Sequence, residues 1–254
     1  MVFKSYAEWS TAHGAAIKWW PSHFNLDNIT YLFQKDTYHS PLAETATRPL
    51  INSIIVSFTG TALAVILGVL AAYGVSRYKV NKEFPLMLLT LRMFPPVAVL
   101  IPLMIMWAFI KFTDTWYGLS LVYALTTLPF GVWLMLTFFE ELPNELTEAA
   151  IVDGCSNWQA FIKVILPLAK GGIASTALFC FILNWSDYAV ALTLTSRNMK
   201  TAPVFLGMLQ NAYVGEQYGP KAALGIIAVI VPVVIGIAIQ KYLVRGLTFG
   251  AIKK

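Results

Sequence analysis

The chain has 254 residues, of which 57% are hydrophobic and only 12% charged, and its formal net charge is +5. A soluble domain carries about 25% charged residues, so this composition excludes an ordinary soluble enzyme or binding module. The basic residues stand at the ends of apolar runs, as they do in membrane proteins, and this placement argues against nucleic acid as a partner. We therefore expect an all-α, polytopic membrane protein that contacts lipid.

The residues that most often bind metals are few and scattered. Cys155 lies in a polar stretch and Cys180 in an apolar run, and the three histidines fall in the polar N-terminal part of the chain. No pair has the spacing of a ligand set, so we expect neither a disulfide framework nor a metal site.

Five apolar runs are long enough to cross a bilayer, which requires about 20 apolar residues. We predict five transmembrane helices, at residues 50–76, 84–110, 117–138, 171–194 and 222–243. The remaining organisation is an N-terminal external segment at 1–49, a transmembrane domain at 50–247 that includes a polar loop at 140–170, and a C-terminal tail at 248–254.

Basic residues predict the orientation of these spans. Arg77, Lys79 and Lys82 follow the first span, and further basic residues follow the last one from Arg245 onward. Cytoplasmic loops retain such charge, so these segments and the loop at 140–170 are expected in the cytoplasm. The loop at 195–221 is then external, although it also carries basic residues.

This orientation places residues 1–49 outside the membrane, yet no apolar signal segment follows Met1. A polar segment of this length needs a preceding span in order to cross. We therefore expect a further helix, encoded upstream of Met1, that is absent from this sequence. The alternative is that a partner holds the first span in place during assembly.

The first span carries a ladder of small residues, spaced four apart: Gly60, Ala64, Gly68 and Ala72. This spacing puts them on one helix face, and small residues allow two helices to approach closely in lipid. We predict a helix-packing face. The alternative is that glycine and alanine are simply common in spans.

Prolines predict broken helices. Pro95, Pro96 and Pro102 fall in the second span, and Pro129 and Pro232 interrupt the third and fifth. Each removes a backbone donor. Irregular backbone at membrane depth is tolerated where it is buried in protein or lines a cavity, so we expect the second span to line a translocation path. A kinked packing helix is the alternative.

Two ionisable residues, Arg92 and Asp187, fall within spans or near their ends, where charges are costly and usually face a cavity. Asp187 stands beside Asn184 and Trp185. An amide, an indole and a carboxylate could together bind a polyhydroxylated solute, so these four residues are candidates for a substrate path. The same group could instead satisfy a kinked helix internally.

The polar loop at 140–170 is patterned as a helix–turn–helix. Glu145 and Glu148 open the first helix, where the helix dipole favours acids. Leu146, Ala149 and Ala150 form one small, shallow face of this helix. Gly154 is placed to cap its C-terminus.

The second helix of this loop is predicted by its start signal and its apolar face. Ser156 and Gln159 match a capping box. The apolar face has helical spacing and consists of Trp158, Phe161, Ile162 and Ile165. We expect the first helix to enter a partner's groove and the second to lie against the membrane domain.

This loop resembles the signature of ATP-binding-cassette (ABC) importer permeases, which is EAA, three residues, Gly, nine residues, then I-x-L-P. The matching residues are Glu148, Ala149, Ala150, Gly154, Leu166 and Pro167, and Val164 replaces the usual Ile. The stretches "RMFPPVAVLIPL", "LPFGVWLMLTFF", "NWSDY" and "KYLVRGLTFGAIKK" are similar to the carbohydrate-uptake branch of that family, and to its maltose-type second permease subunit in particular.

The resemblance implies a type I ABC importer permease fold in a bacterial inner membrane. It also implies that the loop is a coupling helix whose Glu148 pairs with a basic residue of a cytoplasmic ATPase subunit. The implied partners are a second homologous permease, two ATPase subunits that bind ATP and Mg²⁺, and an external solute-binding protein. Permeases of this branch usually have six spans, in agreement with an absent first helix.

The chain contains no G-x-x-x-x-G-K-[ST] motif, so we expect no enzymatic activity and no cofactor bound by this chain itself. The implied solute is a sugar or polyol. The alternatives are a permease of the same type for glycerol phosphate, a peptide or another small solute, and more remotely a secondary carrier, although no internal repeat is evident. An intramembrane enzyme is disfavoured because no histidine lies in a span.

Overall fold

The computed structural model of the chain describes residues 26–34, 45–78, 83–90, 92, 96–211, 215–216 and 218–250, without the side chains of 96–97, 210–211, 215–216 and 241–250. The helices are α2 (Asp27–Phe33), α3 (Thr47–Tyr78), α4 (Phe84–Thr90), α5 (Pro96–Phe109), α6 (Trp116–Glu141), α7 (Glu145–Val152), α8 (Asn157–Ala160), the π-helix η3 (Phe161–Ile165), α9 (Leu166–Leu168), α10 (Lys170–Ser186), α11 (Ala189–Leu194), α12 (Ala202–Met208) and α13 (Tyr218–Gly250). Two short strands, β1 (Gln210–Asn211) and β2 (Gly215–Glu216), pair antiparallel.

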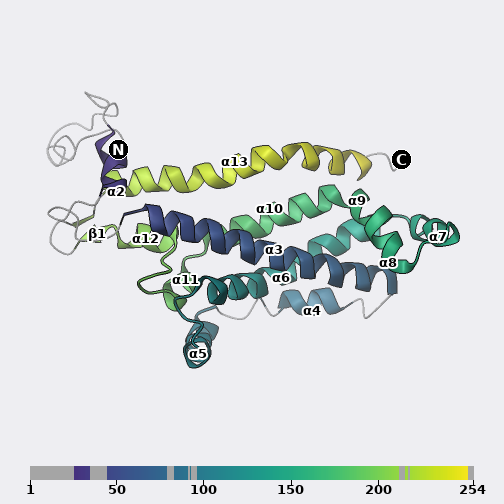
Figure 1. Cartoon of the computed structure of the whole chain (residues 1–254), viewed down its shortest axis with the longest axis horizontal. Coiled ribbons are helices and arrows are strands. Elements are labelled where there is room, and N and C mark those ends of the chain that lie inside the picture. The colour runs from purple at the N-terminus through teal and green to yellow at the C-terminus, as the bar shows by residue number, and fades with distance from the viewer. Residues whose placement is uncertain are drawn as a thin grey trace.

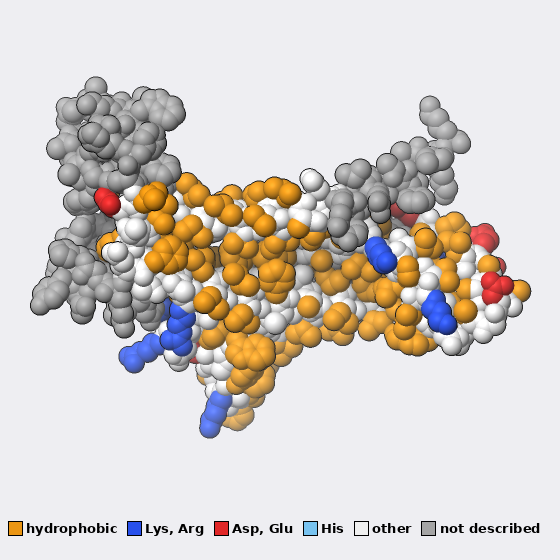
Figure 2. Space-filling view, turned by 45° about the horizontal axis from the view of Figure 1, so that its top comes forward, with side chains coloured by type: hydrophobic (Ala, Val, Ile, Leu, Met, Phe, Trp, Pro, Cys, Tyr) orange, Lys and Arg blue, Asp and Glu red, His pale blue; other side chains and the backbone are white. Residues whose placement is uncertain are grey.

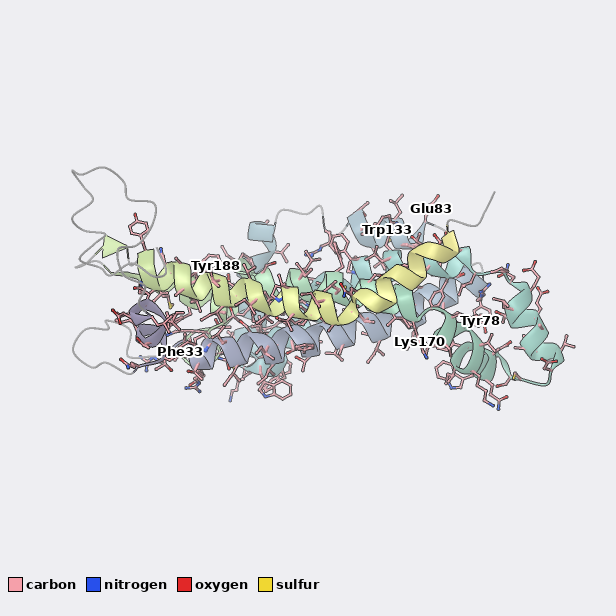
Figure 3. The ribbon with its side chains drawn as sticks, turned by 90° about the horizontal axis from the view of Figure 1, so that it is seen from above. Phe33, Tyr78, Glu83, Trp133, Lys170 and Tyr188 are labelled. Carbon is pink, nitrogen blue, oxygen red and sulfur yellow. The ribbon has the colours of Figure 1, made fainter. Side chains whose placement is uncertain are left out.

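The helices α3, α6, α10 and α13 run along the long axis of an elongated bundle (Figure 1). The loop helices α7 and α8 lie at one end, and α2, α12 and β1 lie at the other. Viewed from above, Phe33 and Tyr188 fall toward the second of these ends, whereas Tyr78, Glu83 and Lys170 fall toward the first (Figure 3). The segment at 26–34, predicted to be external, therefore shares an end with the loop at 195–201 and lies opposite the loop at 140–170.

Within the described residues, three helices are long and apolar enough to cross a membrane: Thr47–Tyr78, Trp116–Glu141 and Tyr218–Gln240. A fourth span results if Asn157–Leu168 and Lys170–Ser186, which are bent by 73°, count as one. These helices cover four of the five predicted spans. Both α6 and α13 continue through Pro129 and Pro232, so the prediction that these two prolines interrupt their helices was wrong.

The second predicted span, at 84–110, is divided into α4 and α5. Within α5, Ala98–Phe109 forms an apolar helix that is shorter than a membrane span. The helix α5 begins at Pro96. Proline is well placed at the first position of a helix because the N–H that it lacks would have no partner there, and it disfavours helical backbone in the preceding residue. Pro95 lies outside the described residues, whereas Pro102 is accommodated inside α5.

The fourth predicted span, at 171–194, also divides, because α10 ends at Ser186 and α11 begins at Ala189. Asp187 between them has an extended backbone, with φ −67° and ψ 126°. Its Oδ1 accepts hydrogen bonds from the backbone N–H groups of Val190 and Ala191, at 3.1 and 3.2 Å. The Asp187 side chain thus supplies the acceptor that starts a separate helix.

The ladder of small residues lies along the contact between α3 and α6, and all four of its members are buried. A Cβ atom at Gly68 would lie 2.9 Å from the carbonyl carbon of Gly131, and one at Gly60 would lie 2.8 Å from the Cβ of Tyr123. The two backbones therefore approach more closely than side chains at these positions would allow.

Candidate coupling loop and substrate cavity

The helix α7 projects at the end of the bundle (Figure 1). Glu145 and Glu148 lie in its first turn and are exposed, and the adjacent Ala149 is also exposed. Ala150 faces inward and is buried. The predicted shallow face of Leu146, Ala149 and Ala150 is thus divided, with Ala150 packed and the other two open to a partner.

Gly154 ends α7 as predicted. Its φ is +89°, its N–H donates to the carbonyl of Ile151 at 2.9 Å, and the N–H of Cys155 donates to the carbonyl of Ala150 at 2.9 Å. These two bonds form a Schellman motif, in which glycine is preferred because the left-handed backbone has little cost for a residue without Cβ. A Cβ at Gly154 would meet no atom within 4 Å. The requirement for glycine is therefore conformational.

The predicted capping box is confirmed. The N–H of Gln159 donates to the Ser156 hydroxyl at 3.2 Å, and the N–H of Ser156 donates to Oε1 of Gln159 at 3.0 Å. These bonds satisfy two of the donors that would otherwise be unpaired at the start of α8. The turn between α7 and α8 is therefore fixed at both helix ends.

The second helix of the loop lies against the membrane helices, but only half of its predicted apolar face is buried. Phe161 and Ile165 are buried, whereas Trp158 and Ile162 are exposed. The turn at Phe161–Ile165 is a π-helix, which is wider than an α-helix and changes the angular spacing on which the prediction relied. Leu166 is half-buried and packs against the buried cluster that contains Phe161 and Ile165, whereas Pro167 is exposed.

Two residues of α3, Tyr73 and Arg77, fasten this loop to the bundle. Arg77 was predicted to follow the first span at 50–76, but α3 continues to Tyr78, and neither residue was predicted to contact the loop. The ring of Tyr73 lies 4.4 Å from that of Phe161, centroid to centroid. The Arg77 guanidinium donates to Oδ1 of Asn144, directly before α7, and to the carbonyl of Leu142 at 3.5 Å. Their spacing of four residues places both on one face of α3, but the predicted span ended before Arg77, so this signal was not used.

Three of the four substrate-path candidates line one cavity of about 390 Å³. This polar cavity is bounded by Arg92, Tyr123, Thr126, Thr127, Leu183, Asn184, Ser186, Asp187, Tyr188 and Ala189. The opposite charges of Arg92 and Asp187 therefore face the same cavity.

The fourth candidate, Trp185, is not among the lining residues. Its indole N–H donates to the carbonyl of Ala228 on α13 at 2.9 Å, and its ring stacks on Phe181 with a centroid distance of 5.8 Å. This arrangement matches the alternative role considered for it, which was to satisfy helix packing internally. The indole is buried between helices and does not line the cavity.

Other lining groups are held by specific contacts. Asn184 is buried and donates from Nδ2 to the Thr61 hydroxyl at 3.1 Å. The Arg92 guanidinium carbon lies 4.9 Å from the ring centroid of Phe130, a cation–π distance. The residues contributed by α6 (Tyr123, Thr126 and Thr127) were missed from the sequence. Polar side chains in an apolar span were the only signal for them.

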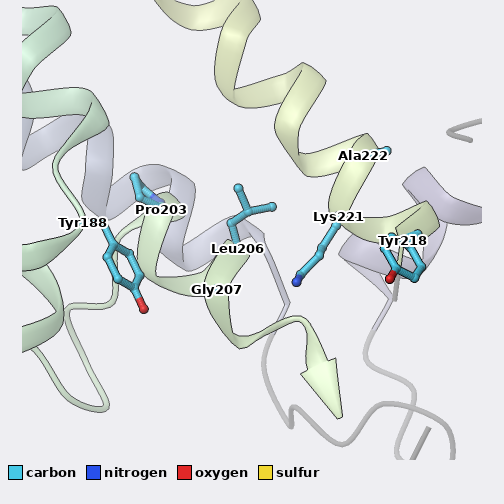
Figure 4. Close-up of a pocket in the computed structure, with 7 residues that line it drawn as sticks. All are labelled: Tyr188, Pro203, Leu206, Gly207, Tyr218, Lys221 and Ala222. Carbon is cyan, nitrogen blue, oxygen red and sulfur yellow. The ribbon is translucent and has the colours of Figure 1, made fainter. Parts of the chain in front are cut away.

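A second space, the outer hollow, lies at the end of the bundle that carries α12 (Figure 4). Its volume is about 620 Å³, and it is lined by Tyr188, Pro203, Leu206, Gly207, Tyr218, Lys221 and Ala222. Tyr188 lines both the outer hollow and the polar cavity. Among the described residues, no group of three or more His, Cys, Asp or Glu side chains could hold a metal ion.

An elongated membrane bundle with broken helices, a polar cavity and a capped helix–turn–helix at one end is the architecture of a transport permease. The chain belongs to the family of binding-protein-dependent transport system inner membrane components, whose sequence profile matches residues 47–249. The resemblance to importer permeases is thereby confirmed, as is the inner-membrane location.

Two curated relatives illustrate the match. The trehalose transport system permease protein SugB of Mycobacterium tuberculosis (strain CDC 1551 / Oshkosh) is 36% identical over 241 residues, which cover 92% of this chain and 84% of that protein. The trehalose/maltose transport system permease protein MalG of Thermococcus litoralis (strain ATCC 51850 / DSM 5473 / JCM 8560 / NS-C) is 33% identical over 256 residues, which cover 100% of this chain and 89% of that protein.

Solved structures confirm the fold. A bacterial ABC transporter involved in the import of the acidic polysaccharide alginate matches with a TM-score of 0.71 at 22% identity, over 91% of this chain and 85% of that one. The MetNI methionine ABC transporter matches with a TM-score of 0.62 at 16% identity, over 78% of this chain and 93% of that one. At these identities the likeness concerns the fold alone.

Proposed function

We propose that this permease lines the membrane path for a sugar or a related polyol, and that the polar cavity is part of that path. The observation that carries the proposal is the cavity itself, which gathers an arginine, a carboxylate, an amide and several hydroxyls inside an apolar bundle. The names of two relatives agree with it, because they are permeases for trehalose and for trehalose and maltose.

The charges in the cavity favour a neutral solute. Arg92 can donate hydrogen bonds and Asp187 can accept them, so hydroxyl groups satisfy both. A phosphate would pair with Arg92 but would be repelled by Asp187. A polyhydroxylated neutral molecule is therefore the better fit, and glycerol phosphate is the competing solute.

ATP hydrolysis in this proposal belongs to separate subunits. Two cytoplasmic ATPase subunits bind ATP and Mg²⁺, a second homologous permease completes the pathway, and an external binding protein delivers the solute. The helix α7 supports this arrangement, because Val152 is 86% exposed and Ile151 44% exposed beside the acidic first turn. Exposed apolar side chains on a rigidly capped helix fit a groove in a partner, and Glu148 is placed to pair with a basic residue there.

Uptake by the assembled transporter tests the proposal. Cells that lack other routes for trehalose, maltose and glycerol phosphate would express this permease with its partner subunits, and uptake of each labelled solute would be measured. We expect uptake of a sugar, and we expect Asp187→Asn to reduce it. Asparagine can still cap α11, so this variant removes the charge while retaining the helix start. Uptake of glycerol phosphate alone, or unchanged sugar uptake by Asp187→Asn, would contradict the proposal.

A further inference from the structure

The outer hollow and the polar cavity share one side chain. Tyr188 lines both spaces, whereas the other lining residues belong to one or the other. The outer hollow is formed by α12, the start of α13 and Tyr188, and its lining is mostly apolar (Figure 4). Tyr188 is therefore the residue at which the two spaces adjoin.

The backbone places Tyr188 at a joint. It lies between Asp187, where α10 has ended, and Ala189, where α11 begins. Its side chain is 45% exposed, so it is not held in the packed core. A ring at a break between two helices can change position through a few backbone torsions, as hinge residues do.

The helix α12, which forms the wall of the outer hollow opposite Tyr188, is fixed in place. The N–H of Ala202, the first residue of α12, donates to the buried hydroxyl of Ser53 on α3 at 2.7 Å. Val204 and Phe205 of the same helix are 2% exposed. The helix α12 is thereby anchored to α3. Of the two walls of the outer hollow, Tyr188 is therefore less constrained than α12.

Gly207 of α12 provides the space in which the Tyr188 ring lies. A Cβ atom at Gly207 would be 3.1 Å from Cε2 of Tyr188 and 3.2 Å from its hydroxyl oxygen. These distances are shorter than ordinary van der Waals contacts, so alanine at this position would require the ring to shift by a few tenths of an ångström.

We propose that Tyr188 is a gate between the outer hollow and the polar cavity, and that Gly207 is its seat when the gate is closed. The proposal rests on the proposed function, because it assigns a step along the same solute path. The tyrosine ring offers a flat apolar face for the C–H groups of a sugar and a hydroxyl for its polar edge, so it would also contact the solute during passage.

Thiol labelling tests the gate without knowledge of the solute. In a variant whose Cys155 and Cys180 are replaced by alanine, Thr126→Cys places a thiol in the polar cavity and Ala222→Cys places one in the outer hollow. An impermeant maleimide is added outside intact cells.

We expect Ala222→Cys to react readily and Thr126→Cys slowly. Adding Tyr188→Ala should speed the second reaction several-fold and leave the first unchanged. The proposal would be overturned if Thr126→Cys reacted with the maleimide at the same rate with and without Tyr188→Ala. It would also be overturned if Ala222→Cys did not react.

Sugar uptake supplies the second test, with a matched glycine control. We expect Gly207→Ala to change uptake of labelled trehalose or maltose several-fold, and Gly225→Ala to behave as the parent protein, since a Cβ at Gly225 meets nothing within 4 Å. Adding Tyr188→Ala should remove the effect of Gly207→Ala, because no ring remains to be displaced. Independent effects of the two substitutions would overturn the gate. Absence of sugar uptake by the parent protein would refute the proposed function instead, and the labelling experiment would still decide the gate.

Discussion

The Asp114 carboxylate holds the backbone of Asn198 through both of its oxygens. The N–H of Asn198 lies 3.2 Å from Oδ1 and 3.0 Å from Oδ2 of Asp114, and the N–H groups of Ser196 and Met199 also donate to Oδ1. The turn between α5 and α6 is thus fastened to the loop after α11. Asn52 of α3 secures the same loop by donating to the carbonyls of Asn198 and Lys200, each at 3.0 Å.

Acid should release this loop. Burial raises the pKa of Asp114, but the backbone N–H groups of Ser196, Asn198 and Met199 outweigh that effect, and its pKa lies below the ordinary value. The stabilisation is therefore fully present above the unfolded carboxyl pKa of about 4, and it is lost as the pH falls through the lower folded value. We expect limited proteolysis within 195–201 to increase at acidic pH.

Replacing Asp114 with Asn should produce the loosened loop already at neutral pH, at a cost of about 1 kcal/mol after allowance for solvent screening. Proteolysis of this variant should depend less on pH than that of the parent protein. A loop that is equally protected in both proteins at neutral pH would contradict the role of the carboxylate.

Gly68→Ala should destabilise the bundle by about 1–3 kcal/mol, because its Cβ would lie 2.9 Å from the Gly131 backbone and the two helices would have to separate. Thermal unfolding of the purified protein in detergent measures the effect. Gly74→Ala is the matched control on the same helix, since a Cβ there meets nothing within 4 Å. The control should be neutral or slightly stabilising. Equal unfolding temperatures for the two variants would show that the contact between Gly68 and Gly131 tolerates an added methyl group.

Gly154→Val should disturb the end of α7 by about 1–2 kcal/mol, because a β-branched residue strongly resists a positive φ. Hydrogen exchange at the amides of Gly154 and Cys155 reports the loss of the Schellman bonds. Asparagine tolerates this backbone better, so Gly154→Asn should retain most of the protection. Similar protection in the valine and asparagine variants would argue against the conformational requirement.

Glu148→Lys should leave the protein in the membrane but reduce binding of the ATPase subunit at least tenfold (roughly 1.4 kcal/mol or more) and abolish uptake, because it replaces an attractive charge on α7 with a repulsive one. Co-purification of the ATPase subunit with the permease measures binding. Glu140→Lys, at the exposed end of α6, is the control with the same change of charge. Identical co-purification in both variants would indicate that the ATPase docks elsewhere.

Regular spacing in the sequence was sufficient to predict several of these structural features. The ladder from Gly60 to Ala72, the cap at Gly154 and the box formed by Ser156 and Gln159 each depend on residues within one helix or turn, so their geometry follows from local rules. The division of α10 from α11 was not predicted, because the apolar run continues across Asp187 and only the folded backbone shows that its carboxylate starts a new helix.

The remaining features depend on distant partners. The polar cavity requires Tyr123 and Thr126 of α6 to face Asp187, and no periodicity relates those segments. The Asp114 carboxylate binds backbone N–H groups more than 80 residues away, and backbone groups carry no signature in the sequence. Trp158 and Ile162 are exposed although uniform α-helical spacing predicted them to be buried, and the π-helix at Phe161–Ile165 departs from that spacing.

The helix α3 is continuous over 32 residues, contacts the loop of α7 and α8 through Tyr73 and Arg77, and secures the opposite loop through Asn52 and Ser53. Its closest approaches to α6, at Gly60 and Gly68, lie between these two ends. At 1.5 Å per residue, Asn52 and Arg77 are about 38 Å apart along the helix. If α3 tilts as a rigid body about the stretch between Gly60 and Gly68, its two ends move in opposite directions. A displacement of the loop at 140–170 is then transmitted along a single helix to the end where α12 forms its wall of the outer hollow.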